Sequence, residues 1–252
     1  MFLNGGGLLF FKRGCGCFHL RLQTICAMLI LTLTFLKEIV SMKRIEHREE
    51  KWIFPFVEYS CMNKKDKLPL IVQLHGAGER GEGKEDLCKV DVNGFSKVIK
   101  NESSDCIVIM PQCPLDTFWA AKVESIVKFI EQLVCEYNVD EDRICLTGLS
   151  MGGYGTWFTA MARPDLFAAI APICGGGMAW NADVLKMPIW TFHGAEDSVV
   201  SPYQTDEMVS SLKKAGADVI YTRVDGVGHN VWENAYNMEL IEWLLSKKRN
   251  NI

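Results

Sequence analysis

The sequence lacks the features that mark several large classes of protein. Its formal net charge is −4, so it offers no basic face of the kind that nucleic-acid binding requires. Near the amino terminus, the apolar run between Arg21 and Lys37 is only 15 residues long, short of the 18 or more that a membrane-spanning helix needs. No A-x-A-like cleavage site follows that run, and no internal repeat or low-complexity linker follows residue 42. A small molecule or a peptide is therefore the expected substrate.

The cysteines also lack the spacing of a metal site. Cys15 and Cys17 have no second pair at zinc-finger distance, so we expect no metal. Cys106, Cys145 and Cys174 lie in or beside apolar runs, where cysteine behaves as a small hydrophobic residue. Although the chain has ten cysteines, this distribution favours reduced thiols and a cytoplasmic protein.

Residues 1–41 differ in composition from the rest of the chain and are expected to form a separate extension. Three interpretations stay open: a spurious or dispensable stretch before a true start at Met42, a signal segment, or a membrane anchor. The first keeps the protein cytoplasmic, whereas the other two make it secreted or membrane-anchored. The catalytic domain is expected to span residues 42–252, a length that can bury a substantial core.

From about residue 52, short apolar runs alternate with longer amphipathic runs, the pattern of an α/β protein with a parallel sheet. The apolar runs predict strands, and the runs with helical periodicity predict helices. The expected strands are 68–74, 106–110, 143–147, 167–173, 188–192 and 219–224, and the expected helices are 122–137, 154–162, 202–215 and 237–247.

The most informative stretch is Gly148-Leu149-Ser150-Met151-Gly152, a G-x-S-x-G pentapeptide between an expected strand and an expected helix. In that context the serine occupies a sharp turn that projects its hydroxyl from the end of the sheet. Glycines on either side allow neighbouring backbone to approach the turn closely. Ser150 is therefore the candidate nucleophile.

A serine hydroxyl needs a base to remove its proton, and the base needs an acid to orient it. Of five histidines, only His229 lies late in the chain within a flexible turn, after the last expected strand. Glu196 and Asp197 follow an earlier strand and are candidates for the acid, with Asp225 as a weaker rival. Asp225 precedes a glycine and suits a role in its own turn.

The attacked carbonyl oxygen becomes negative and needs preorganised N–H donors, an oxyanion hole. We expect one donor at Met151, the residue after the nucleophile, and the second at Ala77, in the glycine-rich loop 75–81. That loop also contains Gly76, Gly78 and Gly81 at the G-x-G-x-x-G spacing of a dinucleotide site. The charged, glycine-interrupted residues 82–86 are an unlikely start for the packed helix that such a site requires, so we expect no bound cofactor.

Several aromatic residues fall in loops near these elements and are candidates for the walls of an acyl or aryl pocket, although simple packing is an equally good account of them. They are Phe118, Trp119, Trp180 and Trp232.

Three segments together resemble the α/β-hydrolase superfamily: the loop from Leu74 to Gly81, the stretch from Gly148 to Gly155, and His193-Gly194-Ala195-Glu196-Asp197. Within it they are similar to the phospholipase/carboxylesterase and prolyl-oligopeptidase-like branch, which includes feruloyl-esterase-like enzymes and predicted peptidases. The resemblance covers about residues 52–245. It implies a three-layer fold with a mostly parallel central sheet flanked by helices and little or no cap domain.

The resemblance also implies roles for the candidate residues: Ser150 as nucleophile, Asp197 rather than Glu196 as the acid, and His229 as the base. The expected function is hydrolysis of carboxylic esters through an acyl-enzyme, with a small aryl or acyl ester as substrate and no obligate protein partner. A serine peptidase of the prolyl-oligopeptidase-like type and a non-catalytic binding module with the same fold are the alternatives.

Overall fold

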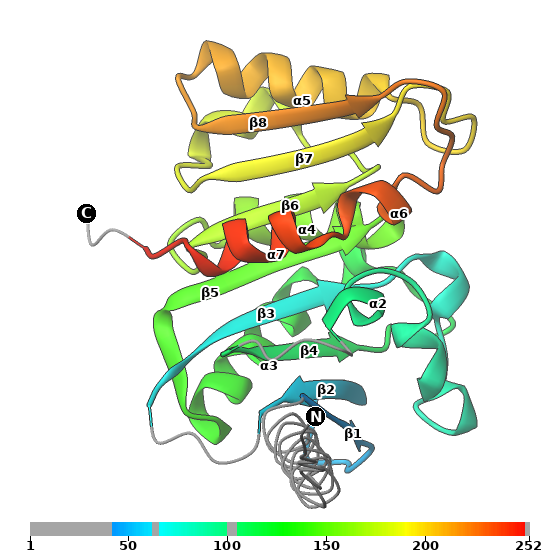
Figure 1. The fold of residues 1–252 in the computed structure, drawn as a ribbon, viewed down its shortest axis with the longest axis vertical. Helices are drawn as coiled ribbons and strands as arrows, with labels where there is room; N and C mark the ends of the chain where they lie inside the picture. Colours follow the sequence, from blue (N-terminus) through cyan, green and yellow to red (C-terminus); the bar gives the residue numbers. More distant parts are fainter. Residues whose placement is uncertain (1–41, 62–65, 100–104, 250–252) are drawn as a thin grey trace, which may run out of the picture. The chain divides into compact units, whose positions relative to one another are not determined.

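The described residues of the computed structural model, 42–61, 66–99 and 105–249, contain an eight-stranded sheet with the order β1-β2-β4-β3-β5-β6-β7-β8 (Figure 1). Strands β1 and β2 pair antiparallel, as do β2 and β4, whereas every pair from β4 and β3 onward is parallel. Parallel strands bring their carboxyl ends to one edge of the sheet, where α/β proteins place their sites. The expected extension 1–41 lies outside the described residues, so its boundary and role stay a prediction.

The strands are β1 (Lys43–His47), β2 (Phe56–Ser60), β3 (Leu68–Leu74), β4 (Ile107–Pro111), β5 (Val139–Leu149), β6 (Ala169–Ile173), β7 (Ile189–Gly194) and β8 (Val219–Val224). The α-helices are α2 (Ser96–Ile99), α3 (Val123–Glu136), α4 (Met151–Ala162), α5 (Tyr203–Lys214), α6 (Trp232–Ala235) and α7 (Met238–Leu245). The connections within the described residues also contain the 3₁₀ helices η1 (Ala77–Glu79), η2 (Glu85–Asp91), η3 (Trp119–Ala121) and η4 (Ala179–Val184).

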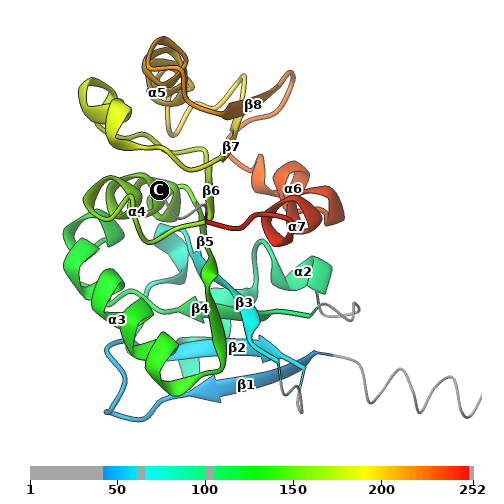
Figure 2. The same cartoon turned by 90° about the vertical axis from the view of Figure 1, so that its left-hand side faces the viewer.

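Helices cover both faces of the sheet (Figure 2): α3, α4 and α5 lie on one face, and α2, α6 and α7 on the other. The period-two alternation of a strand divides its side chains between the two faces. In β3, Leu70, Val72 and Leu74 pack into one buried cluster with residues of α3 and α4, whereas Ile71 packs into a second cluster with residues of α7. Burial on both faces explains why the central strands are apolar throughout.

This architecture confirms the predicted three-layer α/β fold with a mostly parallel sheet. The expected strands and helices are all present, with ends that differ by a few residues. The largest shifts are at β5, which begins at Val139 rather than at residue 143, and at α4, which begins at Met151 rather than at residue 154. The connection between β6 and β7 contains only the short helix η4.

The sequence pattern did not predict the first two strands, β1 and β2. Residues 43–47 form β1, and His47 is its last residue: its Nε2 lies 2.7 Å from Glu58 Oε2, and its ring stacks on Phe56. The strand was missed because it is charged and half exposed, as edge strands often are. Residues after Gly81 also differ from expectation, since η2 buries Leu87 and Val90.

Two further observations concern the described residues. Among the described residues, no helix combines the length and the apolar character needed to cross a lipid bilayer. Five cysteines of the described ranges are free thiols, namely Cys88, Cys113, Cys135, Cys145 and Cys174, and Cys106, Cys145 and Cys174 are buried as expected of small hydrophobic residues.

Candidate active site

Ser150 lies between the end of β5 and the first residue of α4, at the carboxyl edge of the sheet. Its backbone has φ 53° and ψ −115°, a conformation that residues other than glycine rarely adopt. The turn is held by its N–H, which donates to Ile173 O at 2.9 Å. The backbone therefore fixes the serine at a strained strand-to-helix turn with its side chain partly exposed.

Positions 148 and 152 require glycine because the structure leaves no room for a side chain there. A Cβ on Gly152 would lie 1.9 Å from Leu74 O, and one on Gly148 would lie 2.3 Å from Gly152 O. Both obstacles are backbone atoms, which cannot move aside without displacing the turn. The close approach brings the first turn of α4 against the end of β3, where the loop with Ala77 begins.

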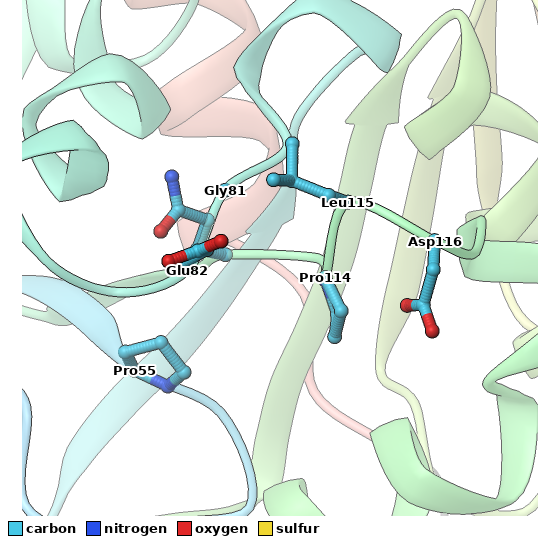
Figure 3. Close-up of a pocket in the computed structure, with 7 residues that line it drawn as sticks. Pro55, Gly81, Glu82, Pro114, Leu115 and Asp116 are labelled. Carbon is cyan, nitrogen blue, oxygen red and sulfur yellow. The ribbon is translucent and has the colours of Figure 1, made fainter.

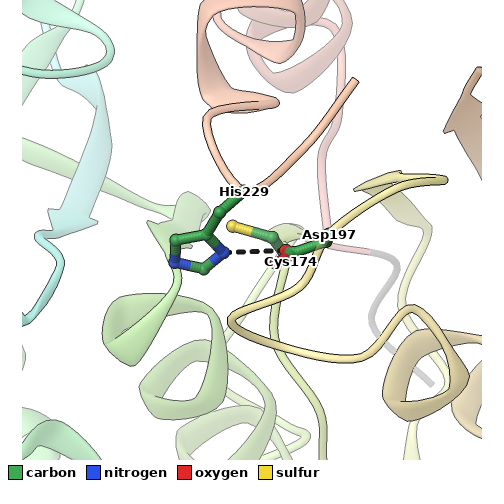
Figure 4. A group of neighbouring side chains, drawn as sticks. All are labelled: Cys174, Asp197 and His229. Carbon is green, nitrogen blue, oxygen red and sulfur yellow. Dashed lines mark hydrogen bonds and ion pairs between the residues drawn. The ribbon is translucent and has the colours of Figure 1, made fainter. Parts of the chain in front are cut away.

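The structure brings Ser150, Asp197 and His229 together from three distant parts of the chain. The His229 Nδ1–H donates to Asp197 Oδ2 at 2.7 Å (Figure 4), and Ser150 Oγ lies 2.9 Å from His229 Nε2. Since a carboxylate only accepts, the hydrogen of the neutral imidazole is on Nδ1 and Nε2 accepts from the serine hydroxyl. The edge of the His229 ring packs against Trp232, with 5.4 Å between ring centroids.

The carboxylate of Asp197 is buried, and its charge is stabilised by donors. Burial by itself would raise its pKa, but hydrogen bonds from His229 and from the N–H groups of Val200 and Val199 outweigh burial and leave the pKa lowered. Both backbone donors reach Oδ1 at 2.9 Å. The group is therefore a preorganised anion beside the imidazole.

The rival acids lie elsewhere. Glu196 and Asp225 are exposed, and the His229 imidazole bonds to Asp197. Asp225 sits in a turn beside Gly226, whose φ is +72°. This arrangement agrees with a role for Asp225 in its own turn.

The two expected oxyanion donors both begin helices. Ala77 is the first residue of η1 and Met151 is the first residue of α4, so neither N–H has a partner within its helix. A Cβ on Gly76 would lie 2.8 Å from Leu149 Cδ1, which shows how closely the loop approaches the end of β5. Two available N–H groups thus belong to segments that pack against each other.

The loop with Ala77 is anchored by residues whose role the sequence did not indicate. His75 is buried, its Nδ1–H donates to Gly76 O at 2.6 Å, and its Nε2 accepts from Cys113 N–H at 2.9 Å. Burial lowers the pKa of His75 to about 4, so the ring stays neutral. Arg80 donates to Ala77 O at 3.0 Å, and Trp119 Nε1–H donates to His75 O at 3.0 Å.

The four loop aromatics proposed as pocket walls have different environments. Trp119 is buried and serves as an anchor of the loop, so it is not a pocket wall. Phe118 and Trp180 are exposed, by 55% and 81% respectively, and are free to meet a ligand. Trp232 lies against His229.

A pocket lies at the Gly81 end of the same loop and is lined by Pro55, Gly81, Glu82, Pro114 and Asp116, among others (Figure 3). Gln112 also lines it, but both ends of that amide are already bonded, to Gly83 N–H and to the carbonyls of Glu79 and Asp86. None of Ser150, Asp197 and His229 lines this pocket.

Cys174, Asp197 and His229 place three ligand-type atoms within 4.8 Å of one another, the one such group that could hold a metal ion among the described residues (Figure 4). The imidazole and carboxylate are already joined by a hydrogen bond, and burial raises the pKa of the Cys174 thiol to about 12. A neutral thiol is a poor metal ligand. The geometry therefore favours a hydrogen-bonded triad over a metal centre.

Fold and geometry together define the class: an α/β-hydrolase fold with a serine at a strand-to-helix turn and a histidine and an aspartate within bonding distance. Residues 120–183 match the model of the prolyl oligopeptidase family. A thermostable esterase of known structure has a TM-score of 0.68 with 33% identity, over 84% of this chain and 64% of that chain. These matches support an α/β-hydrolase that is similar to the prolyl oligopeptidase family.

Two curated relatives are also similar. A bifunctional acetylxylan esterase/xylanase of Neocallimastix patriciarum is 27% identical over 161 residues, which are 62% of this chain and 23% of the relative. A poly(3-hydroxyalkanoate) depolymerase C of Paucimonas lemoignei is 27% identical over 155 residues, which are 47% of this chain and 37% of the relative. The chain thus spans about a quarter to a third of the length of these relatives.

Proposed function

We propose that this protein is a serine hydrolase that cleaves carboxylic esters through an acyl-enzyme intermediate, with Ser150 as nucleophile, His229 as base and Asp197 as acid. The observation that carries the proposal is the continuous hydrogen-bonded chain from Ser150 Oγ to His229 Nε2, at 2.9 Å, and from His229 Nδ1 to Asp197 Oδ2, at 2.7 Å. The named activities of the similar proteins, an esterase, an acetylxylan esterase and a polyester depolymerase, support it.

In the acylation step, His229 Nε2 takes the hydroxyl proton while Ser150 Oγ forms a bond to the ester carbonyl carbon. The Asp197 carboxylate stabilises the resulting imidazolium through the bond to Nδ1–H. The carbonyl oxygen becomes an oxyanion that the N–H groups of Met151 and Ala77 stabilise. The C–O bond then breaks, and the alcohol leaves with the proton from Nε2.

In the second step, water loses a proton to His229 and attacks the acyl carbon. The Ser150 Oγ–C bond breaks, the serine regains its proton, and the carboxylic acid leaves. All proton transfers use side chains of this site, so the proposed cycle needs no metal or organic cofactor. The proposed substrate is a small-molecule acyl or aryl ester.

The direct test uses p-nitrophenyl acetate, butyrate and feruloyl esters together with a fluorophosphonate label. The wild-type protein should hydrolyse esters and carry one adduct on Ser150, whereas Ser150→Ala should lose the adduct and about 10⁶-fold in kcat. Ser198→Ala, a change at an exposed serine next to Asp197, is the matched control and should keep both. Unchanged hydrolysis by Ser150→Ala would refute the proposal.

A second candidate is a peptidase, favoured by the match of residues 120–183 to the prolyl oligopeptidase family. An amide needs better protonation of its leaving group than an ester does, so the two activities are separable on one enzyme. Comparing kcat/KM for an aryl ester with that for an aminoacyl p-nitroanilide of the same acyl group decides between them. A higher value for the anilide would establish the peptidase.

We also propose that the protein works in a reducing compartment such as the cytoplasm, because five free thiols lie in the described ranges. Secretion or membrane anchoring depends on residues 1–41, which are outside the described residues. Cell fractionation of the full chain, compared with a chain that begins at Met42, tests this proposal.

A further inference from the structure

A second histidine contacts the acid of the proposed triad. His193 is the second-to-last residue of β7, at the end of the strand nearest the site, and is fully buried. Its Nε2 lies 3.2 Å from Asp197 Oδ2, the same oxygen that accepts the His229 Nδ1–H. One carboxylate oxygen therefore lies within bonding distance of two imidazoles.

The surroundings of His193 determine which of its nitrogens carries a hydrogen. Its Nε2 also lies 2.9 Å from Val200 O, and a carbonyl and a carboxylate both only accept, so Nε2 must be protonated. Its Nδ1 lies 2.7 Å from Thr205 Oγ1, which is itself 2.8 Å from Gly175 O. The ring is thus held from both sides, by α5 and by the loop after β7.

We propose that His193 is a positioning residue of the triad: its Nε2–H, with the ring held by Thr205, fixes the Asp197 carboxylate in the orientation that bonds to His229. This inference rests on the proposed function. It assigns His193 no contact with substrate, only an action through Asp197.

The proposal follows from how a carboxylate is oriented. The terminal torsion of an aspartate is broad, so the side chain needs donors on both oxygens to hold one orientation. The N–H groups of Val199 and Val200 hold Oδ1, and the Nε2–H of His193, which also bonds to Val200 O, lies 3.2 Å from Oδ2 beside His229. Without His193, the only donor to Oδ2 would be His229, and His229 is the residue that Asp197 must itself orient.

A neutral His193 suits this role better than a charged one. Burial lowers its pKa, and the opposing effects of Val200 O, Asp197 and Asp206 do not restore it. The other ionisable groups nearby are the Cys174 thiol, which is neutral, and Arg223 of β8, which pairs with Asp206. A neutral donor orients the carboxylate without adding a positive charge that would compete with the imidazolium of His229.

A matched pair of substitutions separates positioning from packing. The amide nitrogen of glutamine can reach the place of Nε2, whereas that of asparagine reaches only the place of Nδ1. His193→Asn should lower kcat about 10- to 100-fold with little change in KM, because a misplaced base is costly. His193→Gln should restore kcat to within about threefold of the wild type.

The pH profile gives a readout that packing alone does not move. In His193→Asn the carboxylate has lost a donor and attracts the imidazolium of His229 more strongly, so the acid limb of kcat/KM should shift about half a unit to higher pH. His193→Gln should keep the wild-type limb. Equal rates and equal limbs in the two variants would overturn the proposal.

A measurement on the wild-type protein avoids any failure of the variants to fold. The imidazole ¹⁵N–¹H spectrum should show His193 in the Nε2–H form from pH 6 to 8, and an Nδ1–H form would overturn the inference. The proposed function fails separately, if Ser150→Ala keeps its activity. An inactive Ser150→Ala with identical His193→Asn and His193→Gln profiles would refute the positioning role alone.

Discussion

Strands β3 and β7 both run into the tripeptide His-Gly-Ala, as His75-Gly76-Ala77 and His193-Gly194-Ala195. Both histidines are buried, and burial lowers the pKa of both. They differ in what their Nε2 atoms meet. At His75 the nitrogen accepts from Cys113 N–H, and at His193 it donates toward Val200 O and Asp197 Oδ2.

The same tripeptide therefore holds two different loops of the candidate site. The turn after β3 holds the loop with the expected oxyanion donor Ala77, and the turn after β7 holds the loop with Asp197. In each, the neighbouring element decides the tautomer of the imidazole. Four predictions test this difference, from the largest expected effect to the smallest.

The largest effect is expected at the carboxylate of Asp197, in the turn after β7. Asp197→Asn should lower kcat for esters about 10⁴-fold, the loss seen when the acid of a serine triad becomes an amide and the histidine takes the wrong tautomer. Steady-state kinetics check it, with exposed Asp225→Asn as a control that should stay within about twofold. A loss below tenfold would show that the second turn does not serve the triad.

The turn after β3 should instead make the larger contribution to the pH dependence of stability, through His75. The pKa of His75 is lowered to about 4, so between that value and the ordinary histidine pKa of about 6.5 the unfolded chain binds more protons than the folded chain. Stability from this group is therefore full above about pH 6.5 and is lost as the pH falls toward 4, by about 3 kcal/mol.

Urea unfolding of wild-type protein and of His75→Gln at pH 4 to 7 measures this contribution. The free energy of unfolding of the wild type should fall more steeply on acidification than that of the variant. Parallel curves for the two proteins would contradict the assignment of a buried neutral His75.

The glycines of the two turns should also differ. A Cβ on Gly194 would lie 2.1 Å from Gly228 O, a backbone atom of the loop that carries His229, whereas one on Gly76 would lie 2.8 Å from the flexible end of Leu149. Gly194→Ala should therefore lower kcat about 100-fold through displacement of His229, and Gly76→Ala should cost less. A larger loss of kcat in Gly76→Ala than in Gly194→Ala, measured on the same ester, would contradict this prediction.

The smallest effect is expected from the anchor of the first turn. Trp119→Phe removes the indole N–H that bonds to His75 O and should lower the free energy of unfolding by about 1 kcal/mol. Because Trp119 does not touch the second turn's Asp197, the acid limb of the pH profile should stay in place. Denaturant unfolding and a pH–rate profile of the variant measure the two quantities.

The sequence predicts most of the fold because apolar runs and helical periodicity are strong where strands are buried on both faces. Strand β3 was predicted at its observed bounds for this reason. Strands β1 and β2 and the 3₁₀ helix η2 escaped prediction, because β1 is a charged edge strand, Glu58 interrupts the apolar run of β2, and a short 3₁₀ turn has no apolar pattern. Their place depends on long-range pairing, which a local pattern does not contain.

The candidate triad could be proposed because Ser150 has a motif, and His229 and Asp197 follow particular strands in an expected order. Their catalytic roles remain proposals until they are tested. The supporting contacts were not predictable: His193 and His75 were noted as strand ends, but the partners that define them, Thr205 and Cys113, are 12 and 38 residues away. Nothing in a one-dimensional pattern joins such pairs.

The φ of 53° at Ser150 carries an evolutionary consequence. A non-glycine residue held in such a backbone conformation costs on the order of 1–3 kcal/mol. A glycine at position 150 would remove this strain, so Ser150→Gly should be more stable on heating than the wild-type protein. Selection for durability alone would thus remove the candidate nucleophile.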